Sequence, residues 1–140
     1  MYKQFLIDLK KAEPFELEAI KKVNILNGVS LKMRCDNKDY DFMTSDNKTY
    51  EVKNDMMASK TKNFYIEFMS YNKASGIETT KAEYYILIYD KNIYYLIDVI
   101  KLKTLILSHE VKFQKRVNKD KTGYGYLIPI KFIVDISTVI

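Results

Sequence analysis

The chain has 140 residues, 47% of them hydrophobic, and a net charge of +5, which predicts one folded domain over 1–140 and excludes general disorder. No apolar run approaches the roughly 18 residues that span a bilayer, and no signal peptide is predicted. One cysteine and one histidine, Cys35 and His109, exclude an internal disulfide and the usual zinc sites. We therefore expect a cytoplasmic protein without a membrane segment.

The N-terminal region predicts two helices. Residues 2–12 form a short first helix, and Pro14 opens a second, because proline is tolerated at the first helical position. Glu16 falls inside the apolar stripe of the second helix, where a carboxylate needs a partner such as a metal ion. The alternative is an acid in the first turn that the helix dipole stabilises. The stripe consists of Phe15, Ala19, Ile20, Val23 and Leu26.

Extended segments follow the helices. Residues 29–36 alternate apolar and polar side chains, which is typical of a half-buried strand. Residues 40–43 and 49–53 predict the next two strands, joined by turn-forming residues 45–48. With the apolar stretch 64–69 they predict a mixed central sheet of four or more strands flanked by helices, so the expected fold class is α/β.

The turn between the second and third strands determines which side chains share a face. An odd-numbered loop centred on Asp46 pairs Asp41 with Glu51 and Phe42 with Tyr50. Both acids then point to one side of the sheet and both aromatic rings point to the core. A two-residue loop would mix charged and apolar side chains on each face, which register selection disfavours. We expect a loop of about three or five residues.

Asp41 and the triplet Glu51-Val52-Lys53 form a candidate metal site. The carboxylates of Asp41 and Glu51 would supply the hard oxygen ligands that Mg²⁺ prefers, and the Val52 carbonyl is a plausible additional ligand. Lys53 shares the face of Glu51 and would hold a positive charge beside the attacking water or the phosphate. The alternative is an exposed strand on which charged residues alternate with apolar ones.

This arrangement resembles the PD-(D/E)XK phosphodiesterase superfamily, whose pattern is an acid, a variable gap and then Asp/Glu-x-Lys. The pattern here is Asp41 followed by Glu51-Val52-Lys53, with Tyr40 in place of the family's proline. The resemblance covers about residues 13–100 of the chain. It implies a restriction-endonuclease-like fold, with an N-terminal helix followed by a β-meander.

The resemblance also bears on Glu16 and on the origin of the chain. Glu16 is similar to an acid that junction-resolving members carry on an N-terminal helix and that joins their metal site. The segments 63–67 and 75–82 resemble phage and bacterial nuclease-like proteins. A phage or mobile-element origin, and branched or plasmid DNA as the substrate, follow from this resemblance alone.

The second half of the chain adds further elements. Residues 83–89 and 92–99 predict a hairpin, and 99–108 predict a helix. Residues 126–130 predict a last strand, before a closing segment of undetermined type. Glu67 in the stretch 64–69 is a further ligand candidate if it shares the face of Glu51, and otherwise an exposed acid.

Basic residues in loops are candidate nucleic-acid contacts. The polar loop 54–63 starts beside the proposed site, 70–80 is a second loop, and 112–121 is rich in lysine. Basic residues near aromatic ones suit phosphate contact and base stacking; the alternative for 112–121 is a solvated loop. The candidate contacts are Lys60, Lys62, Lys73, Lys81, Lys115, Arg116, Lys119 and Lys121.

We expect a Mg²⁺-dependent DNA endonuclease in which Mn²⁺ can replace Mg²⁺ and which uses no small-molecule cofactor. Water would attack phosphorus in line while the metal offsets charge on the leaving oxygen. A homodimer would provide two sites for two strands. The alternatives are a non-catalytic nucleic-acid-binding protein that keeps the nuclease fold, and an RNA-cleaving enzyme with the same site.

Overall fold

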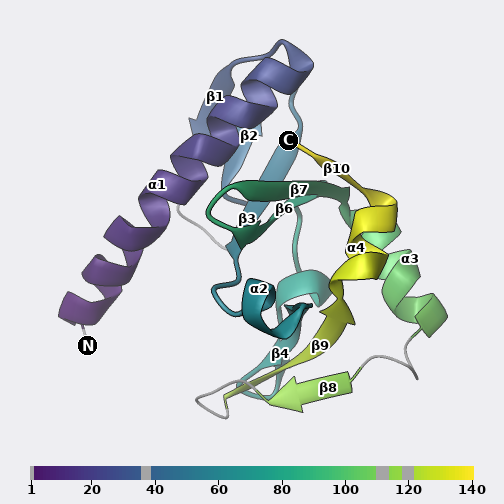
Figure 1. The fold of residues 1–140 in the computed structure, drawn as a ribbon. Helices are drawn as coiled ribbons and strands as arrows, with labels where there is room; N and C mark the ends of the chain where they lie inside the picture. Colours follow the sequence, from purple (N-terminus) through teal and green to yellow (C-terminus); the bar gives the residue numbers. More distant parts are fainter. Residues whose placement is uncertain (1, 36–38, 110–113, 118–121) are drawn as a thin grey trace.

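Two β-sheets form the frame of the protein in a computed structural model, which describes residues 2–35, 39–109, 114–117 and 122–140 (Figure 1). The larger sheet has the strand order β1-β2-β3-β6-β7-β10, and the smaller has the order β5-β4-β9-β8. The larger sheet consists of β1 (Leu31–Arg34), β2 (Phe42–Thr44), β3 (Thr49–Asn54), β6 (Tyr84–Asp90), β7 (Ile93–Asp98) and β10 (Ser137–Val139).

A single long helix, α1 (Tyr2–Asn27), precedes the sheet and contains Pro14 in its interior. The expectation of two helices separated at Pro14 is therefore wrong. Proline removes one backbone donor, but helix-favouring residues lie on both sides of it, so the helix loses one hydrogen bond and continues.

The C-terminal half of α1 covers one face of the larger sheet (Figure 1). Ala19, Ile20 and Val23 are buried as the stripe predicts. Leu26, expected in the same stripe, is 47% exposed. The helix therefore contacts the sheet mainly through the residues before its last turn. They pack in one apolar cluster with Phe42, Tyr50, Ile86, Ile88 and Tyr94.

The β-meander has the predicted register. Phe42 pairs with Tyr50 across β2 and β3, and their stacked rings lie 4.8 Å apart. The Thr44 amide donates to the Lys48 carbonyl at 3.0 Å, which leaves an odd, three-residue loop. The strand predicted within residues 29–36 is present as β1, but the expectation that it is half-buried is wrong, because β1 is exposed along its length at the edge of the sheet.

β3 pairs in parallel with β6, not with the strand that follows it in the chain. The stretch 64–69 lies in β4 (Asn63–Ser70), which belongs to the smaller sheet, so its predicted place in the central sheet is wrong. Tyr85 to Ile88 of β6 are buried without interruption, as in a strand covered on both faces. β4 buries only Phe64 and Ile66, which suits a strand covered on one face.

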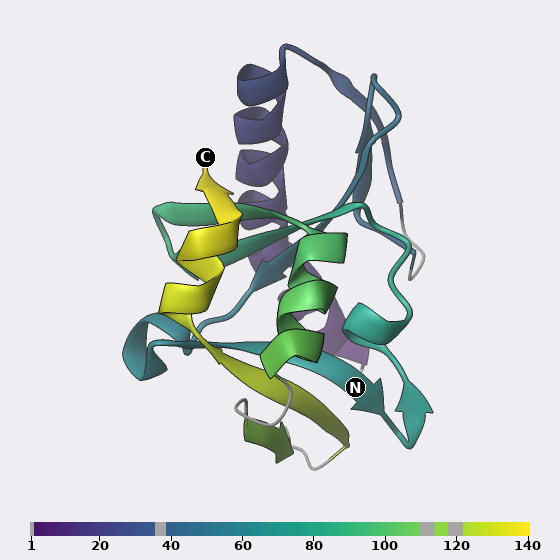
Figure 2. The ribbon, with the colours of Figure 1, turned by 90° about the vertical axis from the view of Figure 1, so that its right-hand side faces the viewer.

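The second face of the larger sheet is covered by the smaller sheet and by short helices (Figure 2). The hairpin predicted at 83–99 is present as β6 and β7, and the helix predicted at 99–108 is α3. The remaining elements are α2 (Ala58–Thr61), β5 (Lys73–Ala74), η1 (Gly76–Glu78), α3 (Val99–His109), β8 (Gln114–Val117), β9 (Gly123–Pro129) and α4 (Ile130–Ile136).

The predicted fold class is confirmed: the protein is α/β, with an N-terminal helix, a β-meander and a mixed central sheet flanked by helices. The predicted last strand, 126–130, lies largely within β9, and the closing segment forms α4 and β10. Among the described residues, no helix combines the length and apolar character that crossing a membrane requires.

Candidate active site

Strand β3 places Glu51 and Lys53 together on the face that looks toward the smaller sheet. Tyr50 and Val52 alternate with them and belong to the apolar cluster under α1. The Lys53 ammonium Nζ lies 3.5 Å from Glu51 Oε2. The Glu51 side chain is 14% exposed, whereas that of Lys53 is 44% exposed. The pair thus combines a largely buried carboxylate with a cation that reaches solvent.

Asp41 lies at the edge of β3, just before β2 begins. Its backbone amide donates to the Tyr50 carbonyl at 2.8 Å, and its Oδ2 accepts a 2.7 Å hydrogen bond from the Val52 amide. The Asp41 carboxylate therefore binds the strand edge at the point where the pairing of β2 with β3 ends. Because the N–H and C=O of one strand residue point to the same edge, the Val52 carbonyl also points to this side.

Burial raises the pKa of Asp41 to about 6. The charges of Glu51 and Glu16 also raise this pKa, while the Val52 amide and the Lys53 charge lower it. Asp41 is thus close enough to Glu51, Glu16 and Lys53 to sense all three charges. A carboxylate in this position is stabilised by any additional positive charge placed beside it.

Glu16 is held in an ion pair. The Arg34 guanidinium contacts both of its oxygens, at 3.1 Å from Nε to Oε1 and 3.1 Å from Nη2 to Oε2. Glu13 adds a 3.6 Å contact to the same guanidinium. The partner that the position of Glu16 requires is therefore Arg34 in this structure, and Glu16 could reach a metal ion only if Arg34 moved.

The donor set available for a metal is small. Within the ranges that the structure describes, no cluster of three or more His, Cys, Asp or Glu side chains could hold a metal ion. Asp41 and Glu51 nevertheless supply carboxylate oxygens, and the buried Glu51 Oε2 faces the Lys53 ammonium at 3.5 Å. Two carboxylates and a main-chain carbonyl fit a Mg²⁺ ion that keeps several waters.

A second group of polar side chains faces Glu51 from the other elements. Tyr85 is the parallel neighbour of Glu51 on β6, and burial, followed by the Glu51 and Glu67 charges, raises its pKa. Glu67 lines a cavity with Lys53, Tyr65 and Tyr85, so it does face the Glu51 side. Sequence reasoning missed both tyrosines. The pairing of β3 with β6, which brings Tyr85 beside Glu51, has no local signal in the sequence, and neither has the packing of β4, which brings Tyr65 to the same cavity.

Asp55 has a structural role. Its Oδ1 accepts a hydrogen bond from the Met57 amide at 3.0 Å, and its Oδ2 accepts one from the Tyr65 amide at 2.8 Å. With both oxygens engaged, it fastens the end of β3 to β4. Asp55 therefore helps to fix the position of β4 relative to β3 next to Lys53.

The candidate nucleic-acid contacts are spread over several elements. Lys60 and Lys62 are exposed at α2, Lys73 is exposed on β5, and Lys81 pairs with Asp39 at 3.9 Å. Lys115 and Arg116 belong to β8, whereas Lys119 and Lys121 lie outside the described residues. Ser59 of α2 lines a cavity with Asn54 and Asp55, so α2 lies close to the end of β3.

In comparisons with known proteins, this sequence matches no protein-family model and no curated protein.

Proposed function

We propose that this protein is a Mg²⁺-dependent DNA endonuclease, with Mn²⁺ able to replace Mg²⁺. The observation that carries the proposal is the gathering of Asp41, Glu51 and Lys53 at β3. The partly buried Asp41 carboxyl has a pKa of about 6, and the Lys53 ammonium lies 3.5 Å from the Glu51 carboxylate. The helix and meander that precede the site agree with the PD-(D/E)XK resemblance of the sequence.

In the proposed reaction, Asp41 and Glu51 would hold the metal with help from the Val52 carbonyl. A bound Mg²⁺ would supply Lewis-acid charge for the phosphate and the attacking water. The Val52 amide fixes one Asp41 oxygen at 2.7 Å, which leaves Oδ1 for the metal. Lys53 leaves its ion pair with Glu51 to position the water or to neutralise the phosphate. Glu16 joins only if Arg34 releases it.

The test is a cleavage panel. The wild-type protein is incubated with supercoiled, linear, branched and single-stranded DNA and with RNA, in Mg²⁺, Mn²⁺ or EDTA. Glu51→Ala and Lys53→Ala are compared with Glu18→Gln and Lys101→Met, which change exposed side chains on α1 and α3. We expect metal-dependent cutting of DNA that only the first two variants lose. Cutting that persists in both would contradict the proposal.

A non-catalytic nucleic-acid-binding protein is the second candidate. It is favoured by the Arg34 guanidinium on both Glu16 oxygens, which deprives the site of a third acid. This candidate predicts DNA binding that survives Glu51→Ala and Lys53→Ala, without metal-dependent cutting of any substrate. Cutting of RNA but not DNA would instead favour an RNA-cleaving enzyme. A homodimer with two sites stays a prediction, which size-exclusion chromatography with light scattering tests.

A further inference from the structure

A small cavity of about 220 Å³ lies between the two sheets behind Lys53. Its volume is below the roughly 300 Å³ at which pockets for drug-sized ligands begin, so it suits a smaller group. Lys53 belongs both to this cavity and to the candidate active site, which places the cavity directly beside the proposed chemistry. The lining residues are Lys53, Tyr65, Ile66, Glu67, Gly76 and Tyr85.

Two buried hydroxyl oxygens in this region, Tyr65 Oη and Tyr85 Oη, have no hydrogen-bond partner among the described residues. The buried Glu51 Oε2 lies 3.5 Å from the Lys53 ammonium and accepts no further hydrogen bond from them. Tyr85 is only 1% exposed, so bulk water does not compensate its hydroxyl. An unsatisfied buried polar group costs about 1–3 kcal/mol. Two such hydroxyls on the wall of one cavity indicate that a polar ligand completes the site.

The cavity walls are held in place by close contacts. Ser75 Oγ donates to Glu67 Oε2 at 3.1 Å, and a Cβ at Gly76 would lie 2.3 Å from the Glu67 carbonyl oxygen. On the far side, a Cβ at Gly125 would lie 2.5 Å from Cζ of Tyr65. Because glycine has no Cβ, the backbone at Gly76 can lie against Glu67 and the backbone at Gly125 can lie against the ring of Tyr65.

The charges of the cavity select a neutral ligand. The charges of Lys53 and Glu51 compensate each other at 3.5 Å. The Glu67 carboxylate therefore remains as a negatively charged hydrogen-bond acceptor on the cavity wall. Glu51 and Glu67 oppose a phosphate inside the cavity. Among the described lining residues only Glu67 carries a carboxylate, which is too few ligands for a second metal ion besides the one proposed at Asp41 and Glu51. The tyrosine hydroxyls can donate or accept, and their rings offer flat apolar surfaces. A planar group with N–H donors, such as a nucleobase, matches this combination.

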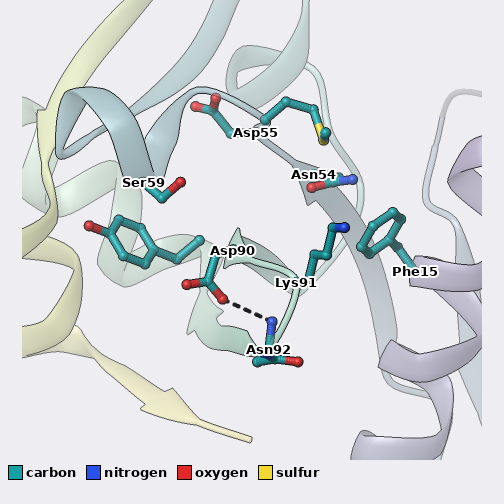
Figure 3. Close-up of a pocket in the computed structure, with 9 residues that line it drawn as sticks. Phe15, Asn54, Asp55, Ser59, Asp90, Lys91 and Asn92 are labelled. Atoms are coloured by element: carbon teal, nitrogen blue, oxygen red, sulfur yellow. Dashed lines mark hydrogen bonds between the residues drawn. The ribbon is translucent and has the colours of Figure 1, made fainter.

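Two further cavities adjoin this chamber in turn through shared lining residues. The more distant one, of about 390 Å³, lies at the ends of β3 and β6 and is lined by Phe15, Asn54 and Lys91 among others (Figure 3). A middle cavity shares Asn54 with it and shares Lys53 and Tyr65 with the chamber. A nucleic-acid strand lying along these cavities would pass Lys53 before it reaches Glu67.

We propose that the chamber receives an unpaired nucleobase that carries an amino group, adjacent to the phosphate that is cut. The inference rests on the proposed nuclease function, because it takes nucleic acid as the ligand. Adenine, cytosine or guanine would donate an amino hydrogen to Glu67. Thymine offers only an imide N–H between two carbonyls, which a carboxylate repels. The favoured substrate is therefore a duplex with an unpaired base.

The test measures binding without cutting. Fluorescence anisotropy in EDTA, repeated in Ca²⁺, compares duplexes that carry one bulged cytosine, adenine, thymine or abasic site. We expect wild-type protein to bind the cytosine and adenine bulges about tenfold more tightly than the abasic one, since a good base contact contributes about 1–3 kcal/mol. Glu67→Gln and Tyr65→Phe should reduce this ratio below about threefold. Glu78→Gln, an exposed acid on η1, should keep it, and thermal unfolding verifies that each variant is folded.

Failure of this inference is distinguishable from failure of the proposed function. Equal affinity for all bulges, or no binding of any duplex in either buffer, overturns the inference, even if the protein cuts DNA in Mg²⁺ and loses this activity in Glu51→Ala. Base-dependent binding that Glu67→Gln abolishes supports the inference, even if no substrate is cut. In that case the chamber belongs to a binding protein and only the cleavage proposal fails.

Discussion

The two faces of β3 and β6 differ in what they bury. Toward α1, Tyr50, Ile86 and Ile88 pack in an apolar cluster. Toward the smaller sheet, the same strands present Glu51 and Tyr85, which bury polar atoms without hydrogen-bond partners among the described residues. Tyr85 and Leu87 also pack in an apolar cluster on this second face, but the second face in addition keeps polar groups that packing alone would remove.

The difference teaches where to look for function in this chain. Alternation along a strand gives each face its own environment, so a site can be built on one face without weakening the other. Unsatisfied buried polar groups call for a specific explanation. Three of the five such atoms among the described residues belong to Glu51, Tyr65 and Tyr85, near Lys53 at the end of a parallel strand pair; the other two are Asn24 Oδ1 on α1 and Ser137 Oγ on β10. The predictions below test the two faces against each other.

The largest effect is expected for Glu51→Gln on the polar face. Loss of one metal-binding charge should reduce cutting about 10³-fold, or about 4 kcal/mol in the activation barrier. Because the substitution keeps the shape of the side chain, the free energy of unfolding should change by no more than about 1 kcal/mol. Single-turnover cleavage and urea unfolding check the two values. A large loss of stability would instead assign Glu51 a structural role.

Ile86→Ala tests the apolar face of the neighbouring strand. Ile86 is fully buried, so its truncation should lower the free energy of unfolding by about 2–5 kcal/mol through lost burial and the cavity left behind. Urea unfolding measures this value. Cutting by the fraction that remains folded should be close to that of the wild type. A folded variant with strongly reduced activity would show that the two faces are coupled.

Local patterns in the sequence predicted the register of the meander and the grouping of the acids. The alternation of Phe42 and Tyr50 with Asp41 and Glu51 is a period-two signal that a strand converts directly into geometry. The pairing of β3 with β6 was not predictable in this way, because about 30 residues separate the strands and parallel pairing needs a crossover connection. The cavity followed from that pairing and was missed with it.

The partner of Glu16 was missed for a related reason. Helical spacing showed that the carboxylate lies on the buried side of α1 and needs compensation. It did not show that Arg34, on an exposed edge strand, reaches back to supply it at 3.1 Å. Long charged side chains extend beyond their own element, so the periodicity of the strand carries no information about where the guanidinium binds.

Asp41→Asn should reveal the cost of burying a carboxylate. The pKa of Asp41 rises from 3.8 to about 6, so the folded chain binds a proton more tightly than the unfolded chain. Protonation of Asp41 therefore contributes to the free energy of unfolding at low pH, and this contribution is lost as pH rises from about 4 to about 6. Asparagine still accepts from Val52 and does not ionise. The variant should be more stable than the wild type at pH 7.5, by at most about 3 kcal/mol and less where solvent screens the charge.

The measurement is urea unfolding of both proteins from pH 4 to pH 7.5. The stability difference between variant and wild type should grow with pH and level off above about pH 6.5. Adding 10 mM Mg²⁺ at pH 7.5 should raise the melting temperature of the wild type only, since the ion binds the charged carboxylate. An equal shift in both proteins would argue against Asp41 as a metal ligand.

Tyr85→Phe gives the smallest effect and the sharpest comparison. Removing an unpartnered buried hydroxyl should leave the free energy of unfolding unchanged or raise it by about 1 kcal/mol, because the orphaned group costs about that much. Affinity for an amino-bearing bulge should fall in the same variant. A residue selected only for packing cannot show both results. If Tyr85→Phe clearly lowers the free energy of unfolding, the Tyr85 hydroxyl makes a hydrogen bond that stabilises the folded protein. The hydroxyl then gives no reason to assign a ligand to the chamber.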